Sequence, residues 1–304
     1  MDVFSTKKRL ETNEELNVSS DFATFGAIHL NVTNLEKTIF FWTTIVGMKL
    51  RKSSGKTAEL GTDSKALVIV YEVAKNRFVK GYSGLYHFAI NAPNANEFAY
   101  MINRLIVKNY PFSAVDHTMS KSIYLDDPDG INIEFTLETP ERFKRVVIQN
   151  GLQIEDKKGN IKSASAFLDI KKVLENLTDT TINRIISNQT CIGHLHLYAT
   201  DVEKSNDFYQ KLGLLSFNSL PYFMYADLGF GGAYKHRIAL NSWHGSNRPL
   251  APIENAGMKH FQINFKTEDK LKKALKNVSY KEEANRFWIK DVTGNNILLT
   301  TQNS

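Results

Sequence analysis

Apolar and polar residues alternate in two stretches of the chain, one beginning at Gly26 and one at Gly193, and this predicts a β-strand in each. The apolar members of the two alternations are Ile28, Leu30 and Val32, and Leu195, Leu197 and Ala199. Asn34 follows the first alternation and Asp201 the second, and both side chains are typical helix N-caps. Helical apolar spacing comes next, so the pattern predicts a strand followed by an amphipathic helix in both places.

These two stretches are parts of a longer internal repeat. The segment "GAIHLNVTNLEKTIFFWTTIVGMKL" corresponds to "GHLHLYATDVEKSNDFYQKLGLLSF", and "LYHFAINAPNANEFAYMINRL" corresponds to "MKHFQINFKTEDKLKKAL". The turn "LDDPDGINIEFT" likewise corresponds to "IKDVTGNNILLTT". Self-similarity over this length indicates two copies of one domain, each made of two strand–helix–strands units.

The repeat predicts how the chain is organised. Residues 1–23 form a polar N-terminal tail, residues 24–137 the first domain and residues 190–304 the second domain. Residues 138–189 connect them, and their polar composition predicts an ordered connector that carries one helix near Ile170–Leu177. The connector lacks the Gly/Ser-rich or Pro-rich composition of a flexible linker.

Composition narrows the functional classes. A chain of 304 residues suits two domains of ordinary size. Its net charge is +6, but the lysines are dispersed, which argues against a nucleic-acid-binding surface. No apolar run is long enough to predict a membrane span. The single Cys191 excludes an intrachain disulfide and fits a reducing compartment, so we expect a cytoplasmic protein.

Two histidines and one glutamate stand out within the first copy. His29 and His87 lie at equivalent positions in the opening strands of the two units, and Glu134 lies in the last strand of the second unit. If the units pack about a pseudo-twofold axis, the three side chains converge as the two-histidine, one-carboxylate set of non-haem iron sites. A histidine in a strand is more often an ordinary core or surface residue, whereas a glutamate between Ile133 and Phe135 needs a polar partner.

A family signature surrounds this glutamate. His117 precedes Ile123 and Tyr124, the turn Asp127-Pro128-Asp129-Gly130 follows, and Glu134 ends the series. With "GLYHFAI", "IGHLHLYATDVE" and "YKHRIALNSWHG", the chain resembles the vicinal oxygen chelate superfamily of glyoxalases, bleomycin- and fosfomycin-resistance proteins and extradiol dioxygenases. Within that superfamily it is most similar to the two-domain catechol-2,3-dioxygenases, and the similarity runs from residue 24 to the end.

The resemblance implies a fold and a chemistry. The fold class is α+β, with two tandem domains, each of two βαβββ modules that form a curved mixed sheet around a cleft. His29, His87 and Glu134 would bind Fe(II), or Mn(II) or another divalent metal, and the substrates would be a catechol-type aromatic diol and O2. His117 would act as an acid/base and Tyr124 would hydrogen-bond an oxygen atom. By pattern alone, Tyr124 could equally be a core aromatic.

The second copy departs from this pattern. It keeps His196 and His260, but Leu298 stands where the first copy has Glu134, so we expect a degenerate copy that helps to close the pocket. Other polar and aromatic residues of this copy could be structural or could line that pocket, and we favour a structural role for each, namely His194, His236, His244, Asn241 and Trp243. Glu72 could be a fourth ligand, as in glyoxalases, but its place at a strand edge favours a surface role.

Two alternatives to ring cleavage stay open. The same ligand types would serve another metalloenzyme of the superfamily, either glyoxalase-like or a fosfomycin-resistance-like thiol transferase. A vestigial site would instead make the chain a non-catalytic protein that binds a small molecule. Two copies in one chain can supply internally the pairing that single-domain relatives obtain by dimerising, so the sequence is compatible with a monomer or a homo-oligomer.

Overall fold

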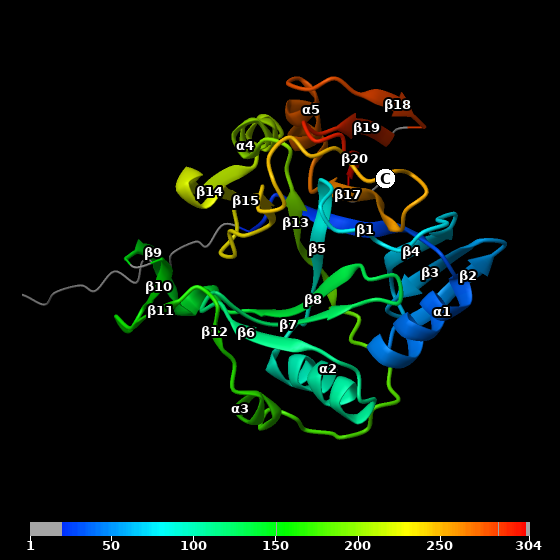
Figure 1. The fold of residues 1–304 in the computed structure, drawn as a ribbon, viewed down its shortest axis with the longest axis vertical. Coiled ribbons are helices and arrows are strands. Elements are labelled where there is room, and N and C mark those ends of the chain that lie inside the picture. Colours follow the sequence, from blue (N-terminus) through cyan, green and yellow to red (C-terminus); the bar gives the residue numbers. More distant parts are fainter. Residues whose placement is uncertain (1–19, 150, 285, 302–304) are drawn as a thin grey trace, which may run out of the picture.

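The computed structural model describes residues 20–149, 151–284 and 286–301, and over them the chain forms four βαβββ modules (Figure 1). The first comprises β1 (Ala23–Val32), α1 (Leu35–Phe40) with the π-helical turn Phe41–Val46, β2 (Lys49–Ser54), β3 (Thr57–Gly61) and β4 (Ala66–Glu72). The second comprises β5 (Gly84–Asn91), α2 (Ala95–Val107), β6 (Ser113–Asp116), β7 (Ser120–Asp126) and β8 (Asn132–Glu138). The predicted α+β fold of βαβββ modules is confirmed.

The other two modules belong to the second copy of the repeat. The third comprises β13 (Cys191–Tyr198), α4 (Val202–Lys211), β14 (Leu215–Leu220), the 3-10 turn Pro221–Phe223, β15 (Tyr225–Gly229) and β16 (Ile238–Asn241). The fourth comprises β17 (Gly257–Phe265), α5 (Glu268–Leu275), β18 (Lys281–Glu283), β19 (Arg286–Lys290) and β20 (Asn296–Thr301). The predicted N-caps form, because the side chain of Asn34 accepts from the Lys37 amide at 2.8 Å and that of Asp201 from the Lys204 amide at 3.0 Å.

The modules combine into two large mixed sheets that each draw on both copies. An eight-stranded sheet runs β18-β19-β20-β17-β1-β4-β3-β2, and a nine-stranded sheet runs β12-β6-β7-β8-β5-β13-β16-β15-β14. The opening strands of the first copy, β1 and β5, therefore lie in different sheets and do not pack about a twofold axis as the convergence of His29 with His87 and Glu134 requires. Instead β1 pairs with β17 and β5 pairs with β13, both antiparallel. The domain boundaries at 24–137 and 190–304 stay a prediction, because each range contributes one module to each sheet.

The connector carries more structure than the predicted helix. It contains the 3-10 turn Pro140–Arg142, then β9 (Phe143–Ile148), β10 (Leu152–Asp156) and β11 (Ile161–Ser163), which form a separate three-stranded sheet. β12 (Ala166–Phe167) then joins the edge of the nine-stranded sheet, and α3 (Ile170–Leu174) supplies the expected helix. Figure 1 shows the three-stranded sheet at one side of the molecule, apart from the two large sheets. Of the predicted tail, residues 1–19 lie outside the described residues.

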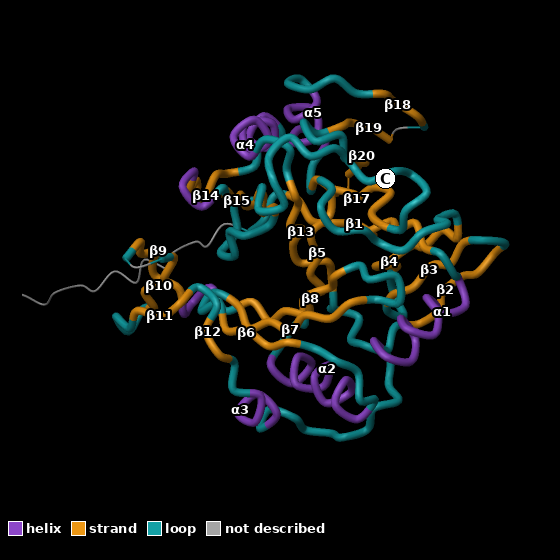
Figure 2. Tube along the Cα trace, in the orientation of Figure 1, coloured by secondary structure: helices purple, strands orange, loops and turns teal. Residues whose placement is uncertain are grey.

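Apolar side chains between the large sheets and their helices form the core. Helices lie on the outer faces, with α2 against β8 and α4 against β15 and β16 (Figure 2). Trp42, Phe88, Phe135 and Phe261 are among the largest fully buried side chains. Among the helices of the described residues, none combines the length and the apolar character needed to cross a membrane.

Candidate metal centre

Three neighbouring strands bring two histidines and a glutamate together in the nine-stranded sheet. β5 carries His87, β8 carries Glu134 and β13 carries His194. The Nε2 atom of His87 lies 3.1 Å from Oε2 of Glu134, and Nε2 of His194 lies 2.9 Å from the same oxygen. One possible ligand atom from each residue lies within 4.8 Å of the others. All three side chains are buried.

The sheet register explains why these side chains meet. Glu134 lies opposite Ala89 on one side of β5, and His194 lies opposite Ala89 on the other side. Opposed residues in a sheet point to the same face, so the two long side chains project beside the short one of Ala89. His87, two residues before Ala89, projects to the same face. A small residue on the central strand therefore leaves room for the carboxylate and the imidazole to touch above it.

The protonation states of the cluster suit a cation. Burial alone would raise the pKa of Glu134, but the charge interaction and hydrogen bond with His194, and then those with His87, hold it well below its usual range. Burial lowers the pKa of His194 to about 4, against the opposing effect of the Glu134 charge. The glutamate is thus ionised and His194 neutral near pH 7, which are the forms that coordinate metal ions.

The residues present fit a divalent transition metal. The Nδ1 atoms of His87 and His194 are buried and have no hydrogen-bond partner among the described residues. The polar contact of each ring is the one that its Nε2 atom makes with Glu134. Two imidazole nitrogens and one carboxylate oxygen form the donor set of non-haem iron sites, which leaves other coordination positions for small molecules. The ion pairs of Glu134 within the described residues are with histidines and not with lysine or arginine. A buried carboxylate of this kind is costly to keep, and a bound cation would remove that cost.

The structure does not bring His29 to this cluster. His29 lies on β1 in the eight-stranded sheet, where its ring stacks on that of His260 with centroids 3.7 Å apart. Its Nδ1 atom lies 2.9 Å from the Tyr71 hydroxyl. The predicted ligand set is corrected at this position, because β1 pairs with β17 and not with β5. His194, for which we expected a structural role, occupies the position beside His87 and Glu134.

His117 and Tyr124, the predicted catalytic pair, do lie together beside the cluster. The Nε2 atom of His117 lies 2.9 Å from the Tyr124 hydroxyl, and the Tyr124 ring centroid lies 5.4 Å from that of His87. Nδ1 of His117 lies 2.7 Å from the carbonyl oxygen of Ala164, which can only accept. The His117 proton therefore sits on Nδ1, and Nε2 accepts from the tyrosine hydroxyl. The connector, through Ala164, sets the tautomer of this histidine.

Burial controls the charge of this pair. It lowers the pKa of His117, so the ring is neutral at pH 7. It also raises the pKa of Tyr124 well above its ordinary value, and the Glu134 charge acts in the same direction. The tyrosine thus keeps its proton and can donate a hydrogen bond.

A second polar group lies on the other side of the cluster. The Nδ1 atom of His236 lies 2.8 Å from Oδ2 of Asp227, and the Tyr225 hydroxyl donates to the same oxygen at 2.9 Å. The His236 ring centroid lies 4.7 Å from that of His194. Of the two roles left open for His236, the structure shows the less favoured one, because this residue lines the cavity that contains the cluster.

Some other residues of the second copy line the cavity, and others make structural contacts away from it. His196 lines the cavity, and its Nε2 atom accepts from Asn241 at 2.8 Å. Trp243 also lines the cavity, which is the less favoured of the two roles left open for it. His244 forms a hydrogen bond with the Ser83 hydroxyl at 2.9 Å, a structural contact as expected.

Glu72, considered above as a fourth ligand, lies in the first copy. Its carboxylate accepts from the Leu35 amide at 2.8 Å and so caps α1, far along the chain from the cluster.

The cluster opens into a cavity of about 830 Å³. Besides the three candidate ligands, its lining includes His117 and Tyr124 from the second module. Aromatic residues from both copies also line it, namely Tyr86, Tyr198, Phe223, Tyr225, Tyr234 and Trp243.

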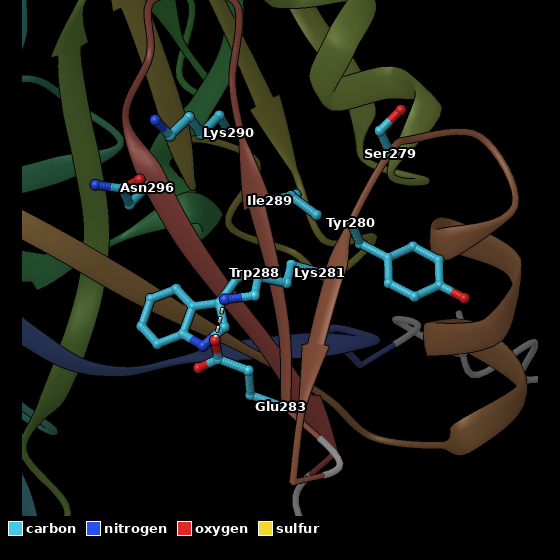
Figure 3. A pocket seen from close by; sticks show the side chains of 8 residues that line it. All are labelled: Ser279, Tyr280, Lys281, Glu283, Trp288, Ile289, Lys290 and Asn296. Atoms are coloured by element: carbon cyan, nitrogen blue, oxygen red, sulfur yellow. Dashed lines mark ion pairs between the residues drawn. The ribbon is translucent and has the colours of Figure 1, made fainter.

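A second hollow of about 560 Å³ lies over β18 and β19 in the other large sheet (Figure 3). Lys281 and Glu283 form an ion pair of 2.6 Å within it, and Trp288 lies beside them. None of its lining residues belongs to the cluster.

The comparisons with known proteins agree with this architecture. Residues 24–135 match the sequence model of the Glyoxalase/Bleomycin resistance protein/Dioxygenase superfamily. The chain is 29% identical over 276 residues to a catechol-2,3-dioxygenase of Bacillus subtilis (strain 168), a match that covers 88% of this chain and 93% of the relative. The resemblance to the superfamily predicted from the sequence is thereby confirmed.

Solved structures show the same fold. A proposed dioxygenase from Bacillus subtilis subsp. subtilis strain 168 superposes with a TM-score of 0.59 at 12% identity, over 92% of this chain and 86% of the other. Glyoxalase I from Zea mays superposes with a TM-score of 0.54 at 17% identity, over 93% of this chain and 94% of the other. At such identities the likeness establishes the fold alone.

The missed ligand, His194, left a signal in the repeat. The position equivalent to His194 in the first module is Ala27, and the position equivalent to Glu134 in the fourth module is Leu298. Ala27 on β1 and Leu298 on β20 both belong to the eight-stranded sheet, so the sheet that lacks the carboxylate also lacks the counterpart of His194. His29, in contrast, corresponds to His196, which lies next to the cluster without joining it. Reading these losses together would have selected His194.

Proposed function

We propose that this chain, whose residues 24–135 match the Glyoxalase/Bleomycin resistance protein/Dioxygenase superfamily, is an extradiol dioxygenase that cleaves a catechol-type aromatic with O2. The observation that carries the proposal is the buried His87–Glu134–His194 cluster at one cavity with His117 and Tyr124. The 29% identity to a catechol-2,3-dioxygenase supports the same reaction class. We propose Fe(II) as the metal, with Mn(II) as the other candidate, and a cytoplasmic location.

The metal would be held by Nε2 of His87, Nε2 of His194 and a carboxylate oxygen of Glu134. When bound, such an ion would supply the redox chemistry that a catechol and O2 need in order to react with each other. The reaction places both atoms of O2 in the product and breaks the ring bond beside the diol. No external reductant is therefore needed.

The protein's own groups would position the substrate and move protons. Tyr124 donates its one hydroxyl proton to Nε2 of His117, so its hydroxyl oxygen would accept a hydrogen bond from a hydroxyl of the substrate. His117 is neutral, and its Nε2 lone pair can accept the proton that a diol hydroxyl gives up, directly or through the Tyr124 hydroxyl. The contact from His117 Nδ1 to Ala164 fixes this orientation. The aromatic lining would exclude water from the reacting oxygens.

The test is anaerobic loading with Fe(II), followed by catechol and air-saturated buffer. We expect a yellow ring-opened product, consumption of one O2 per product, and both atoms of labelled O2 in that product. Glu134→Gln serves as the inactive control. Turnover that is indifferent to oxygen, and that requires a thiol with Mn(II), would contradict the proposal and favour a thiol transferase on the same scaffold.

A further inference from the structure

The cavity is larger than a single dihydroxylated benzene ring requires. Its volume of about 830 Å³ lies in the upper part of the range of roughly 300–1,000 Å³ found for sites that enclose drug-sized ligands. The candidate ligands occupy one part of its lining, and the connector sheet supplies another part. A catechol held at Glu134 would leave much of this space unfilled.

The connector gives the cavity an apolar wall. Val146 on β9 lies opposite Ile154 on β10, and Leu152 lies two residues from Ile154 on the same face. All three line the cavity, together with Phe143, Leu220 and Phe223. Ile154 is only 6% exposed although its sheet has just three strands, because its side chain faces the cavity wall.

Aromatic contacts fix this wall against the nine-stranded sheet. The Phe143 ring packs edge-on against that of Phe217 on β14, with centroids 5.4 Å apart. Figure 1 shows the three-stranded sheet on the β14 side of the molecule. The connector also reaches the reacting groups, because its Ala164 carbonyl binds His117. The segment that carries the apolar wall therefore also orients the acid/base residue His117.

The charges of the cavity exclude an acidic substrate. Lys80 is the one lysine or arginine among the lining residues, all of which belong to the described part of the chain, and it is exposed at the rim. Two buried carboxylates, Glu134 and Asp227, face the interior. A substrate carboxylate at the end of the cavity away from the metal ligands would lose its hydration without gaining a lysine or arginine partner.

Resting on the proposed function, we infer that the site takes an uncharged aromatic diol with an extended apolar substituent. The diol lies at His87, Glu134 and His194, and the substituent lies against Val146, Leu152 and Ile154. The apolar wall selects for the substituent, and the lining has no interior lysine or arginine that would pair with a carboxylate at its end.

Three diols of graded size and charge test this inference on the Fe(II)-loaded protein. They are catechol, 4-butylcatechol, and 3-(3,4-dihydroxyphenyl)propionate, whose side chain has a similar length but ends in a carboxylate. We expect kcat/KM for 4-butylcatechol to exceed that for catechol by about 10-fold or more, as methylene contacts in an apolar pocket provide. The propionate should react no better than catechol.

Variants of the wall provide the matched comparison. Leu152→Ala and Ile154→Ala should each lower the ratio of kcat/KM for 4-butylcatechol to that for catechol. The double variant should lower this ratio by about 10-fold. Ile161→Ala, on the exposed strand β11, should leave the ratio unchanged. Ile154→Lys should raise the relative rate with the propionate, because it adds the missing cation.

The outcomes separate this inference from the proposed function. Cleavage of all three diols at similar kcat/KM, or a preference for the propionate, overturns the inference and leaves ring cleavage standing. Failure to cleave any diol overturns the proposed function, and the inference falls with it.

Discussion

Ala89 determines the geometry of the candidate site although it carries no polar group. It is fully buried between the strands that carry Glu134 and His194, and it lies opposite both residues. The equivalent position of the eight-stranded sheet is Gln262, next to Leu298, and no ligand cluster forms there among the described residues. A short side chain on the central strand is thus a condition for the carboxylate and imidazole to meet.

We predict that Ala89→Leu weakens metal binding by about 10-fold or more, in the range seen for residues that support a ligand shell. The added carbons would occupy the space where Glu134 and His194 touch. Titration of the metal-free protein with Fe(II) measures this affinity. Ala226→Leu is the control, because Ala226 is a buried alanine on β15 whose neighbours Tyr225 and Asp227, on the opposite face, line the cavity. Equal affinity in Ala89→Leu and the unaltered protein would contradict the prediction.

A substitution at Tyr124 tests the catalytic step independently of metal binding. Its hydroxyl lies 2.9 Å from Nε2 of His117, and it is not one of the three candidate ligands. We predict that Tyr124→Phe lowers kcat/KM for the diol by about 100-fold, the size of a lost proton-transfer contact, while the metal content stays the same. Oxygen consumption and metal analysis on one preparation measure both. Loss of the metal, or unchanged kcat/KM, would show that Tyr124 has a different role.

At the scale of elements, the two large sheets are built alike, because each joins one module from the first copy to one from the second. In one sheet β5, β8 and β13 assemble the candidate metal centre. In the other sheet the corresponding strands place His29 against His260, and Trp288 packs edge-on against His260 at 4.8 Å. Two neutral imidazoles stacked in contact are an arrangement that acid should disturb.

We predict a pH dependence of stability from this pair. Burial lowers the pKa of His29 to about 4, and burial followed by the charge of His29 lowers that of His260 to about 3. The unfolded chain takes up these protons near pH 6.5, whereas the folded chain takes them up only near pH 4 and below. The stabilisation is therefore complete above about pH 6.5 and is lost as the pH falls toward 4.

Replacing His260 should reduce this dependence. We expect the metal-free protein to lose about 1–2 kcal/mol more of its free energy of unfolding between pH 8 and pH 5 than His260→Gln does, allowing for the partial exposure of His29. Urea unfolding at pH 8 and pH 5 gives the loss of free energy of unfolding in each protein. The difference between the two proteins at pH 8 gives the effect of the substitution on stability while both histidines are neutral. The same loss in both proteins would refute the assignment.

The sequence predicts the modules well because their signals are local. Alternation, the N-caps Asn34 and Asp201, and the turn at Gly130 all act within a few residues, and each forms as predicted. The pairing of β1 with β17 joins segments far apart in the chain, and either pairing would satisfy the same apolar patterns. The prediction of His29 as a ligand failed for this reason, whereas His87 and Glu134, which share one module, did come together.

At the scale of the whole molecule, the candidate site exists only when both copies and the connector assemble. His87 and Glu134 come from the first copy, His194 from the second, and Ala164 of the connector orients His117. A bound metal would therefore join the two copies through one ion. The repeat that looks redundant in the sequence is required, because neither copy holds three ligands by itself among the described residues.

The most direct test is the metal content of three variants after anaerobic loading with Fe(II) and removal of free ions. We predict about one ion per chain in the unaltered protein and in His29→Ala, and almost none in His194→Ala or Glu134→Ala, because a buried site with two ligands holds the ion poorly. Circular dichroism confirms that each variant is folded. Retention of the metal in folded His194→Ala, together with its loss in His29→Ala, would contradict the assignment of the site.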